Sequence, residues 1–180
     1  KTSPAFLIQR RVLSQPLFTI EKFQLSRRTD EVANQTFVYF LYGLKRKYLG
    51  YRRKNVHSFF SAIMDKKKEK RGVCLKFIHT ADWHLGKIVH GIYMTEKQRN
   101  ILQQFLQIIE EEKPDAIIIA GDLYDRSVPP TEAVDLLNEI LYKINIEMKT
   151  PVIAIAGNHD SAERLSFGSS WLKHSQLYIQ

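Results

Sequence analysis

Residues 116–125 read AIIIAGDLYD. Five consecutive apolar residues, three of them β-branched, predict a short strand that is covered on both faces of a sheet. Pro114 precedes the run and Gly121 follows it, and both residue types mark the ends of regular elements. Asp122 then places a carboxylate at the carboxyl end of a buried strand, which is where sheets built from βαβ units bind ligands. The stretch therefore predicts a buried sheet and a polar site at its edge.

The flanking sequence repeats this alternation of strand and helix. Apolar runs predict further strands at 75–79, 152–155 and 177–179. Apolar residues at helical spacing predict helices over 96–112 and 131–144, with Thr95 and Thr131 as N-caps, and a weaker helix over 163–173. Strand–helix–strand order at these lengths is typical of an α/β fold, with βαβ units, a mainly parallel sheet and helices packed on it.

Potential metal ligands follow three of the predicted strands. Asp82 and His84 follow the first, Asp122 follows the second, and residues 158–160 (Asn-His-Asp) follow the third. A lone Asp at a strand end is more often a turn or helix cap, and Gly157-Asn158 also suits an ordinary turn. Neither alternative explains why the same residue types recur at three equivalent places. We therefore predict a metal site.

The residue types indicate which ions would suit such a site. Carboxylate, imidazole and amide donors without a thiolate favour Mn²⁺, Fe²⁺ or Zn²⁺ over Mg²⁺ alone. Asp82 and His84 can reach one ion, Asp122 can bridge two, and Asn158 can bind the second, an arrangement used to hydrolyse phosphoesters. Three further residues are candidates for contact with substrate or with the ligands: His79, His90 and Asp125. His79 lies inside a predicted strand and suits the core, or a place beside the ligands, better than a ligand role, whereas a solvated loop or cap role suits His90 and Asp125 equally well.

Three motifs resemble the calcineurin-like metallophosphoesterase superfamily: Asp82-x-His84, Gly121-Asp122-x-x-Asp125 and Gly157-Asn158-His159-Asp160. The longer strings at 79–86 and 152–161 are similar to the SbcD-type nuclease subunits of bacterial SbcCD complexes. The resemblance begins at Leu75, runs to residue 180 and includes nothing in 1–74.

The resemblance implies a role for each matched residue. Asp82 and His84 would bind one metal, Asp122 would bridge two, and Asn158 would bind the second. His159 would contact the scissile phosphate, with Asp160 orienting it. It also implies Mn²⁺ as cofactor, with Mg²⁺ or another divalent ion as alternatives, and DNA as the substrate of exonuclease and endonuclease cleavage in recombination, replication and repair. The partners would be an SbcC-type, SMC-like ATPase and a second copy of the subunit.

One departure from the family pattern lies downstream of the third motif. The superfamily completes its site with a Gly-His and a Gly-His-x-His motif, whereas only His174 follows His159 here, in neither context. We therefore expect residues 75–180 to represent the N-terminal half of a metallophosphoesterase sandwich, as a fragment that is inactive by itself.

Charge divides the chain near residue 74. Of 27 Lys and Arg and 19 Asp and Glu, 17 basic and 5 acidic residues precede Leu75, which leaves a net +12 before it and −4 after it. The basic segment 1–74 shows no clear fold in its pattern. It could be a basic arm for nucleic acid, an amphipathic membrane-surface segment, a disordered extension, or translated upstream DNA. We favour the last, since the first Met is Met64 and a start codon at residue 75 would match the resemblance.

The cysteine count and the lengths of the apolar runs argue against two classes of protein, those held by disulfides and those that span a membrane through an apolar helix. A single cysteine excludes a disulfide framework and fits a reducing, cytoplasmic location. The longest apolar run, 37–44, is far shorter than the roughly 20 residues that span a bilayer. Two alternatives to a DNA nuclease stay open: a phosphatase or cyclic-nucleotide phosphodiesterase acting on small molecules, and a non-enzymatic protein that binds nucleic acid through the basic segment.

Overall fold

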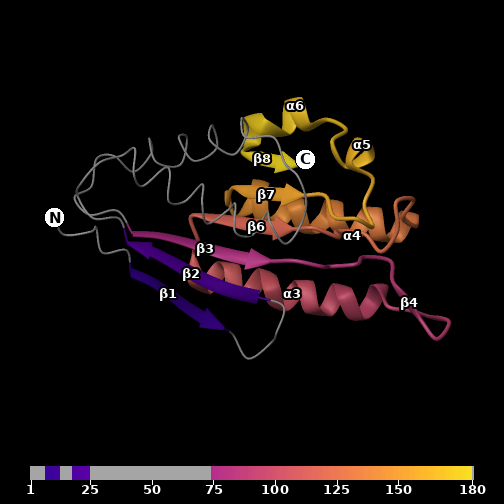
Figure 1. Cartoon of the computed structure of the whole chain (residues 1–180), viewed down its shortest axis with the longest axis horizontal. Helices are drawn as coiled ribbons and strands as arrows, with labels where there is room; N and C mark the ends of the chain where they lie inside the picture. Colours follow the sequence, from indigo (N-terminus) through magenta and orange to yellow (C-terminus); the bar gives the residue numbers. More distant parts are fainter. Residues whose placement is uncertain (1–6, 13–17, 25–73, 180) are drawn as a thin grey trace.

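The computed structural model describes residues 7–12, 18–24 and 74–179. Its main sheet has six strands in the order β1-β2-β3-β6-β7-β8 (Figure 1). The strands are β1 (Leu7–Val12), β2 (Phe18–Gln24), β3 (Cys74–Thr80), β6 (Ala116–Ala120), β7 (Val152–Ile155) and β8 (Leu177–Ile179). The helices are α3 (Thr95–Glu112), α4 (Thr131–Tyr142), α5 (Ala162–Leu165) and α6 (Ser169–Leu172), with a π-helical turn η1 (Lys143–Glu147) and a 3-10 turn η2 (Lys173–Ser175).

The sheet from β3 to β8 is parallel, as predicted. β3 pairs with β6, β6 with β7, and β7 with β8, all in parallel register. Such neighbours need crossover connections, which α3, α4 and the α5–α6 segment supply. The α/β class and the four predicted strands are confirmed, and every residue of β6 is buried.

The helices and the sheet share one apolar core. Ile117 and Ile119 of β6 lie in the same cluster as Phe105 of α3 and Leu136 of α4. Their alternation along β6 matches the side-chain period of a strand, so one face of the sheet meets the helices. This packing fixes the direction of β3, β6 and β7, whose arrows end on the same side of the molecule in Figure 1.

Three details of the predicted helices are wrong. Met94 and Pro130 occupy the N-cap positions of α3 and α4, and neither makes a side-chain cap hydrogen bond, so Thr95 and Thr131 are the first helical residues. The predicted helix over 163–173 is divided into α5, α6 and η2, because Gly168 takes a left-handed backbone at φ 75° between them.

Two strands before residue 74 were not predicted. β1 and β2 pair antiparallel, and β2 pairs antiparallel with β3, in a register that joins Phe18 to Thr80 and Gln24 to Cys74. The sheet is therefore mixed, although mainly parallel. Most of the basic segment 1–74 lies outside the described residues, so its assignment as translated upstream DNA stays a prediction.

A two-stranded hairpin follows β3. β4 (Ile88–Val89) and β5 (Ile92–Tyr93) pair antiparallel around His90 and Gly91, which both have positive φ, of 50° and 78°. Such angles suit a tight hairpin turn. Within the described part of the chain, none of the helices combines the length and apolar character needed to cross a lipid bilayer.

Candidate metal centre

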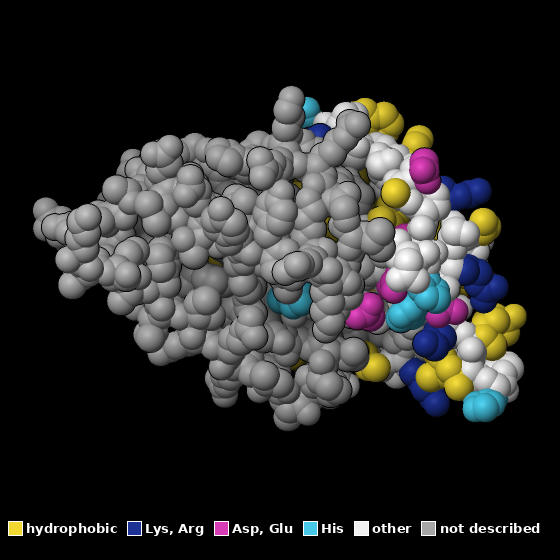
Figure 2. Space-filling model, in the orientation of Figure 1, with side chains coloured by type: hydrophobic (Ala, Val, Ile, Leu, Met, Phe, Trp, Pro, Cys, Tyr) yellow, Lys and Arg dark blue, Asp and Glu magenta, His cyan; other side chains and the backbone are white. Residues whose placement is uncertain are grey.

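Three candidate ligands meet beyond the carboxyl ends of β3, β6 and β7. His84, Asp122 and His159 each offer a donor atom, and these atoms all lie within 4.8 Å of one another. The Nε2 atom of His84 lies 3.8 Å from Oδ2 of Asp122. Figure 2 shows histidine and acidic side chains gathered at this end of the molecule, with Lys and Arg nearby. The structure thus brings together one residue from each predicted strand end.

The spacing of these donors fits a bound cation. Two ligand atoms that each lie about 2.1 Å from one shared ion are separated by roughly 3 to 4 Å, and the His84–Asp122 pair meets that condition. Asp122 is buried and His84 is half-buried, which keeps competing water from much of their surface. Imidazole and carboxylate are donors that divalent transition metals accept. The residues present therefore fit a divalent metal.

Asp122 is held against the loop that follows β7. Its Oδ1 accepts a hydrogen bond from the backbone N–H of His159, at 2.9 Å. A Cβ at Gly157 would lie 2.1 Å from that same oxygen and 2.2 Å from the Asp122 nitrogen, so only glycine permits this approach. The backbone of Asp122 is left-handed, at φ 43°. These contacts aim the remaining Oδ2 at His84.

Asp160 holds the same two loops together from the other side. Its carboxylate accepts backbone N–H bonds from Leu123 (3.0 Å), Tyr124 (2.8 Å) and Gly157 (2.9 Å). Burial, together with the negative charge of Asp160, raises the pKa of the Tyr124 phenol to about 12, so that side chain stays neutral. Asp160 thus acts on the backbone of both ligand loops.

The His159 ring has a different partner from the one predicted. Its Nδ1 lies 2.9 Å from the backbone carbonyl oxygen of Asp125, while the three hydrogen bonds that the structure gives the Asp160 carboxylate all come from backbone N–H groups. A carbonyl can only accept, so this contact places the proton on Nδ1 and leaves Nε2 as a lone-pair donor. In the described structure the Asp125 carbonyl therefore takes the orienting part expected of Asp160.

Asp125 also contacts the other histidine. Its Oδ1 lies 3.3 Å from Nδ1 of His84, and the rings of His84 and His159 meet edge to face with centroids 4.8 Å apart. The geometry of the first contact is that of a close electrostatic approach, since the described residues give His84 Nδ1 no hydrogen bond. Asp125, which the sequence left as one of three secondary candidates, therefore contacts both histidines of the group.

Of the other predicted residues, Asp82, His79 and His90 are not in this group of three. Asp82 and Asn158 have exposed side chains on the loops that carry His84 and His159, and the Asp82 N–H donates to the Gly121 carbonyl at 3.2 Å. His79 lies within β3, half-buried, paired in register with Ile118. His90 is exposed at the tip of the β4–β5 hairpin.

Residues that support the first loop were missed by sequence reasoning. Trp83 donates from Nε1 to the Thr80 hydroxyl at 2.9 Å and meets Phe105 edge to face, which joins the loop to the core. Gln98 makes three hydrogen bonds to the loop backbone. For Gln98 the only sequence signal was a Gln in the first turn of a predicted amphipathic helix, and such residues are common.

Candidate ligands that converge from the carboxyl ends of parallel strands form a candidate metal site of an α/β protein. The chain belongs to the calcineurin-like phosphoesterase family, which it matches over residues 75–179. Over 106 residues it is 56% identical to a protein of Staphylococcus epidermidis (strain ATCC 12228 / FDA PCI 1200) that is named as a subunit of the nuclease SbcCD. That match covers 59% of this chain and 28% of the relative, so the chain spans little more than a quarter of the relative's length.

The close approach at Gly157 makes a first prediction. Gly157→Ala should displace Asp122 and weaken Mn²⁺ binding at least tenfold, with about 1–3 kcal/mol lost from the free energy of unfolding through overpacking. Gly91→Ala is the control, because it meets no atom within 4 Å but has φ 78°. It should cost about 1 kcal/mol for its backbone and leave Mn²⁺ affinity unchanged. Equal Mn²⁺ affinity in both variants, measured by calorimetry, would contradict the packing argument.

The backbone contacts of Asp160 lead to a second prediction, about the stability of the chain. Asp160→Ala leaves three backbone N–H groups without their acceptor, and we expect a loss of about 2–4 kcal/mol in the free energy of unfolding. Asp135→Ala, at an exposed position of α4, should change that quantity by less than about 0.5 kcal/mol. Urea denaturation followed by circular dichroism measures both. Equal stabilities would show that Asp160 is not what joins the two loops.

Proposed function

We propose that this chain carries part of the active site of a DNA nuclease that hydrolyses phosphodiester bonds, of the SbcD type. The observation that carries the proposal is the convergence of His84, Asp122 and His159 from three strand ends. The 56% identity to a nuclease subunit supports DNA over a small phosphorylated molecule as the substrate. A phosphatase or cyclic-nucleotide phosphodiesterase, and a non-enzymatic basic binder, are the alternatives against which it is tested.

In this proposal the ligands are Asp82 and His84 for one ion, Asp122 between two, and Asn158 for the second. The bound metal, which we propose to be Mn²⁺ with Mg²⁺ or another divalent ion as alternatives, would supply water activation and neutralise phosphate charge. The chain's own groups hold these ligands in place. The Asp125 carboxylate lies 3.3 Å from Nδ1 of the His84 imidazole, and the Gly157 backbone leaves room for the Asp122 carboxylate.

His159 is proposed to contact the scissile phosphate. With its Nδ1 directed to the Asp125 carbonyl, the exposed ring keeps Nε2 for a contact with substrate, and a donor atom of the ring lies within 4.8 Å of those of His84 and Asp122. A protonated ring there would donate a hydrogen bond to a phosphate oxygen, which stabilises its charge, or a proton to the leaving oxygen, which is general acid catalysis. Asp160 is proposed to assist by fixing the backbone on which His159 stands.

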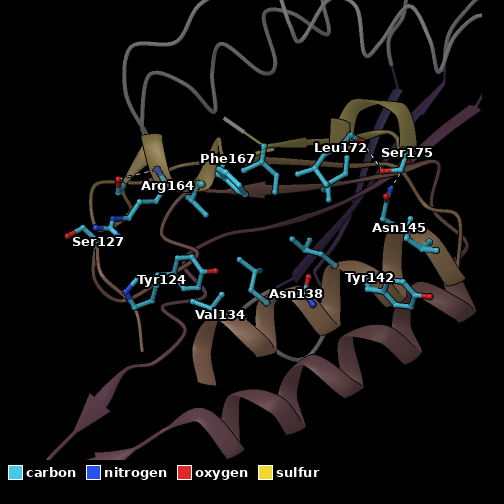
Figure 3. Close-up of a pocket in the computed structure, with 18 of the residues that line it drawn as sticks. Tyr124, Ser127, Val134, Asn138, Tyr142, Asn145, Arg164, Phe167, Leu172 and Ser175 are labelled. Atoms are coloured by element: carbon cyan, nitrogen blue, oxygen red, sulfur yellow. Dashed lines mark hydrogen bonds between the residues drawn. The ribbon is translucent and has the colours of Figure 1, made fainter. Parts of the chain in front are cut away.

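A second copy of the chain is proposed as one partner. A groove of about 500 Å³ lies between α4 and the α5–α6 segment, and Figure 3 shows Val134 and Phe167 on its walls. Val134 is 41% exposed, Phe167 78% and the neighbouring Trp171 68%. Large apolar side chains gathered on one surface favour burial in an interface.

The other proposed partner is an SbcC-type ATPase, in a cytoplasmic complex that acts in recombination, replication and repair.

The dimer proposal predicts the effect of one charge. Val134→Asp should convert a dimer into a monomer in analytical ultracentrifugation at micromolar concentration, because a carboxylate would be buried without a partner. Gln107→Asp, on the exposed face of α3, should leave the dimer intact. A parent chain that sediments as a monomer at all concentrations tested would rule out self-association through this groove.

The nuclease proposal predicts metal binding without turnover in this chain. The 180-residue chain should bind Mn²⁺ weakly and cleave neither duplex ends nor hairpin DNA, since the further histidine motifs of the family do not occur after His159. Asp122→Ala should abolish Mn²⁺ binding. Mn²⁺-dependent DNA cleavage by the parent chain that Asp122→Ala removes would contradict the expected inactivity. Mn²⁺ binding that survives Asp122→Ala would contradict the site.

A further inference from the structure

The loop that carries His84 has an unfavourable backbone. Asp82 and His84 have φ of 56° and 46°, and Gly86 has φ of 81°, so every second residue is left-handed. L residues rarely adopt this region, and such outliers persist where surrounding contacts hold them. On one side the backbone N–H groups of Asp82, His84 and Leu85 donate to the carbonyls of residues 121, 122 and 123, at 3.2, 2.9 and 2.9 Å.

On the other side of the loop, the side chain of Gln98 makes three hydrogen bonds to the loop backbone, and Arg126 adds a longer one from Nη2 to the Gly86 carbonyl, at 3.5 Å. The Gln98 Nε2 donates to the carbonyl oxygens of Trp83, at 3.2 Å, and His84, at 2.7 Å. Its Oε1 accepts from the Gly86 N–H at 3.1 Å. A carboxamide has two N–H donors and one carbonyl, so all of its functional groups are directed at this loop.

The helix that carries Gln98 is firmly anchored. Gln98 lies in the first turn of α3, whose Leu102 and Phe105 are buried in the core. Its backbone N–H donates to the Met94 carbonyl, as a first helical turn requires. The contacts therefore join a rigid element to a strained loop, with half-buried Gln98 between them.

We propose that Gln98 is a positioning residue that holds the His84 backbone in its left-handed conformation and so directs the imidazole at the metal site. The inference rests on the proposed function for the identity of that site. Gln98 touches neither His84's ring nor Asp122 in the hydrogen bonds described, so it acts through the backbone of residues 83–86.

The chemistry of the contact requires an amide. In Gln98→Glu a carboxylate could still accept from Gly86, but it would face the Trp83 and His84 carbonyl oxygens without a proton to donate. In Gln98→Met the side chain has similar length and helix propensity, and all three hydrogen bonds are lost. Because Gln98→Met keeps the length of the side chain, its effect reports the lost hydrogen bonds, and Gln98→Glu tests whether the Gly86 contact alone is enough.

The test uses the 180-residue chain and two measurements. Amide hydrogen exchange, followed by mass spectrometry, measures how often the backbone of the loop opens. Mn²⁺ titration, followed by water proton relaxation, measures the affinity of the site over a wide range. Gln98→Met and Gln98→Glu should each speed exchange at 82–86 at least tenfold while exchange in β6 stays unchanged, and each should weaken Mn²⁺ binding at least tenfold. Gln107→Met, the same change on the exposed face of α3, should alter neither quantity by more than about twofold.

Three outcomes would overturn the proposal. Parent-like exchange at 82–86 in Gln98→Met would show that the loop holds its shape without the amide. Faster exchange in β6 as well as in the loop would show that Gln98 stabilises the whole fold and not this loop in particular. Faster loop exchange with unchanged Mn²⁺ affinity would separate the loop from the site. A parent chain that binds no Mn²⁺ would instead contradict the proposed function, and the exchange measurement would still decide whether Gln98 holds the loop.

Discussion

The contact between Asp122 and the backbone of residues 157–160 is the constraint on which the site depends. Asp122 accepts from the His159 N–H, and Gly157 leaves the space that its carboxylate occupies. Asp160 returns the contact by accepting from the backbone of residues 123, 124 and 157. Each loop thus supplies a carboxylate to the backbone of the other. Because β6 and β7 are parallel neighbours, their ends lie close enough for both contacts to form.

The loop after the first parallel strand, β3, is also held in place by hydrogen bonds to its backbone. β3 delivers His84 beside Asp122, but only through a left-handed turn that the 121–123 backbone holds on one side and Gln98 on the other. Three candidate ligands, Asp82, His84 and Asp122, have positive φ. Asp tolerates this region better than most residues, and backbone strain of this kind concentrates at functional sites. The core beneath supplies the rigidity, since Trp83 rests edge to face on Phe105.

Much of this could be predicted from sequence because it depends on local pattern. The all-apolar run of β6 identifies a buried strand, and the recurrence of Asp and His after three strands identifies the site. The N-caps at Thr95 and Thr131 were wrong because capping depends on where the chain enters the helix, which composition does not determine. Gln98 and the Asp125 carbonyl could not be found, since both act through hydrogen bonds between segments distant in sequence. Strands β1 and β2 escaped prediction because their pattern has no clear period.

Asp122, His84 and their neighbours are proposed to bind a divalent cation at the ends of β3, β6 and β7. Anomalous diffraction from crystals of the chain grown with Mn²⁺, with data collected near the manganese edge, tests this most directly. A peak is expected at coordination distance from Nε2 of His84 and Oδ2 of Asp122, and no such peak is expected in Asp122→Ala crystals. Manganese bound only at other acidic surfaces, with no peak between these two side chains, would contradict the proposal.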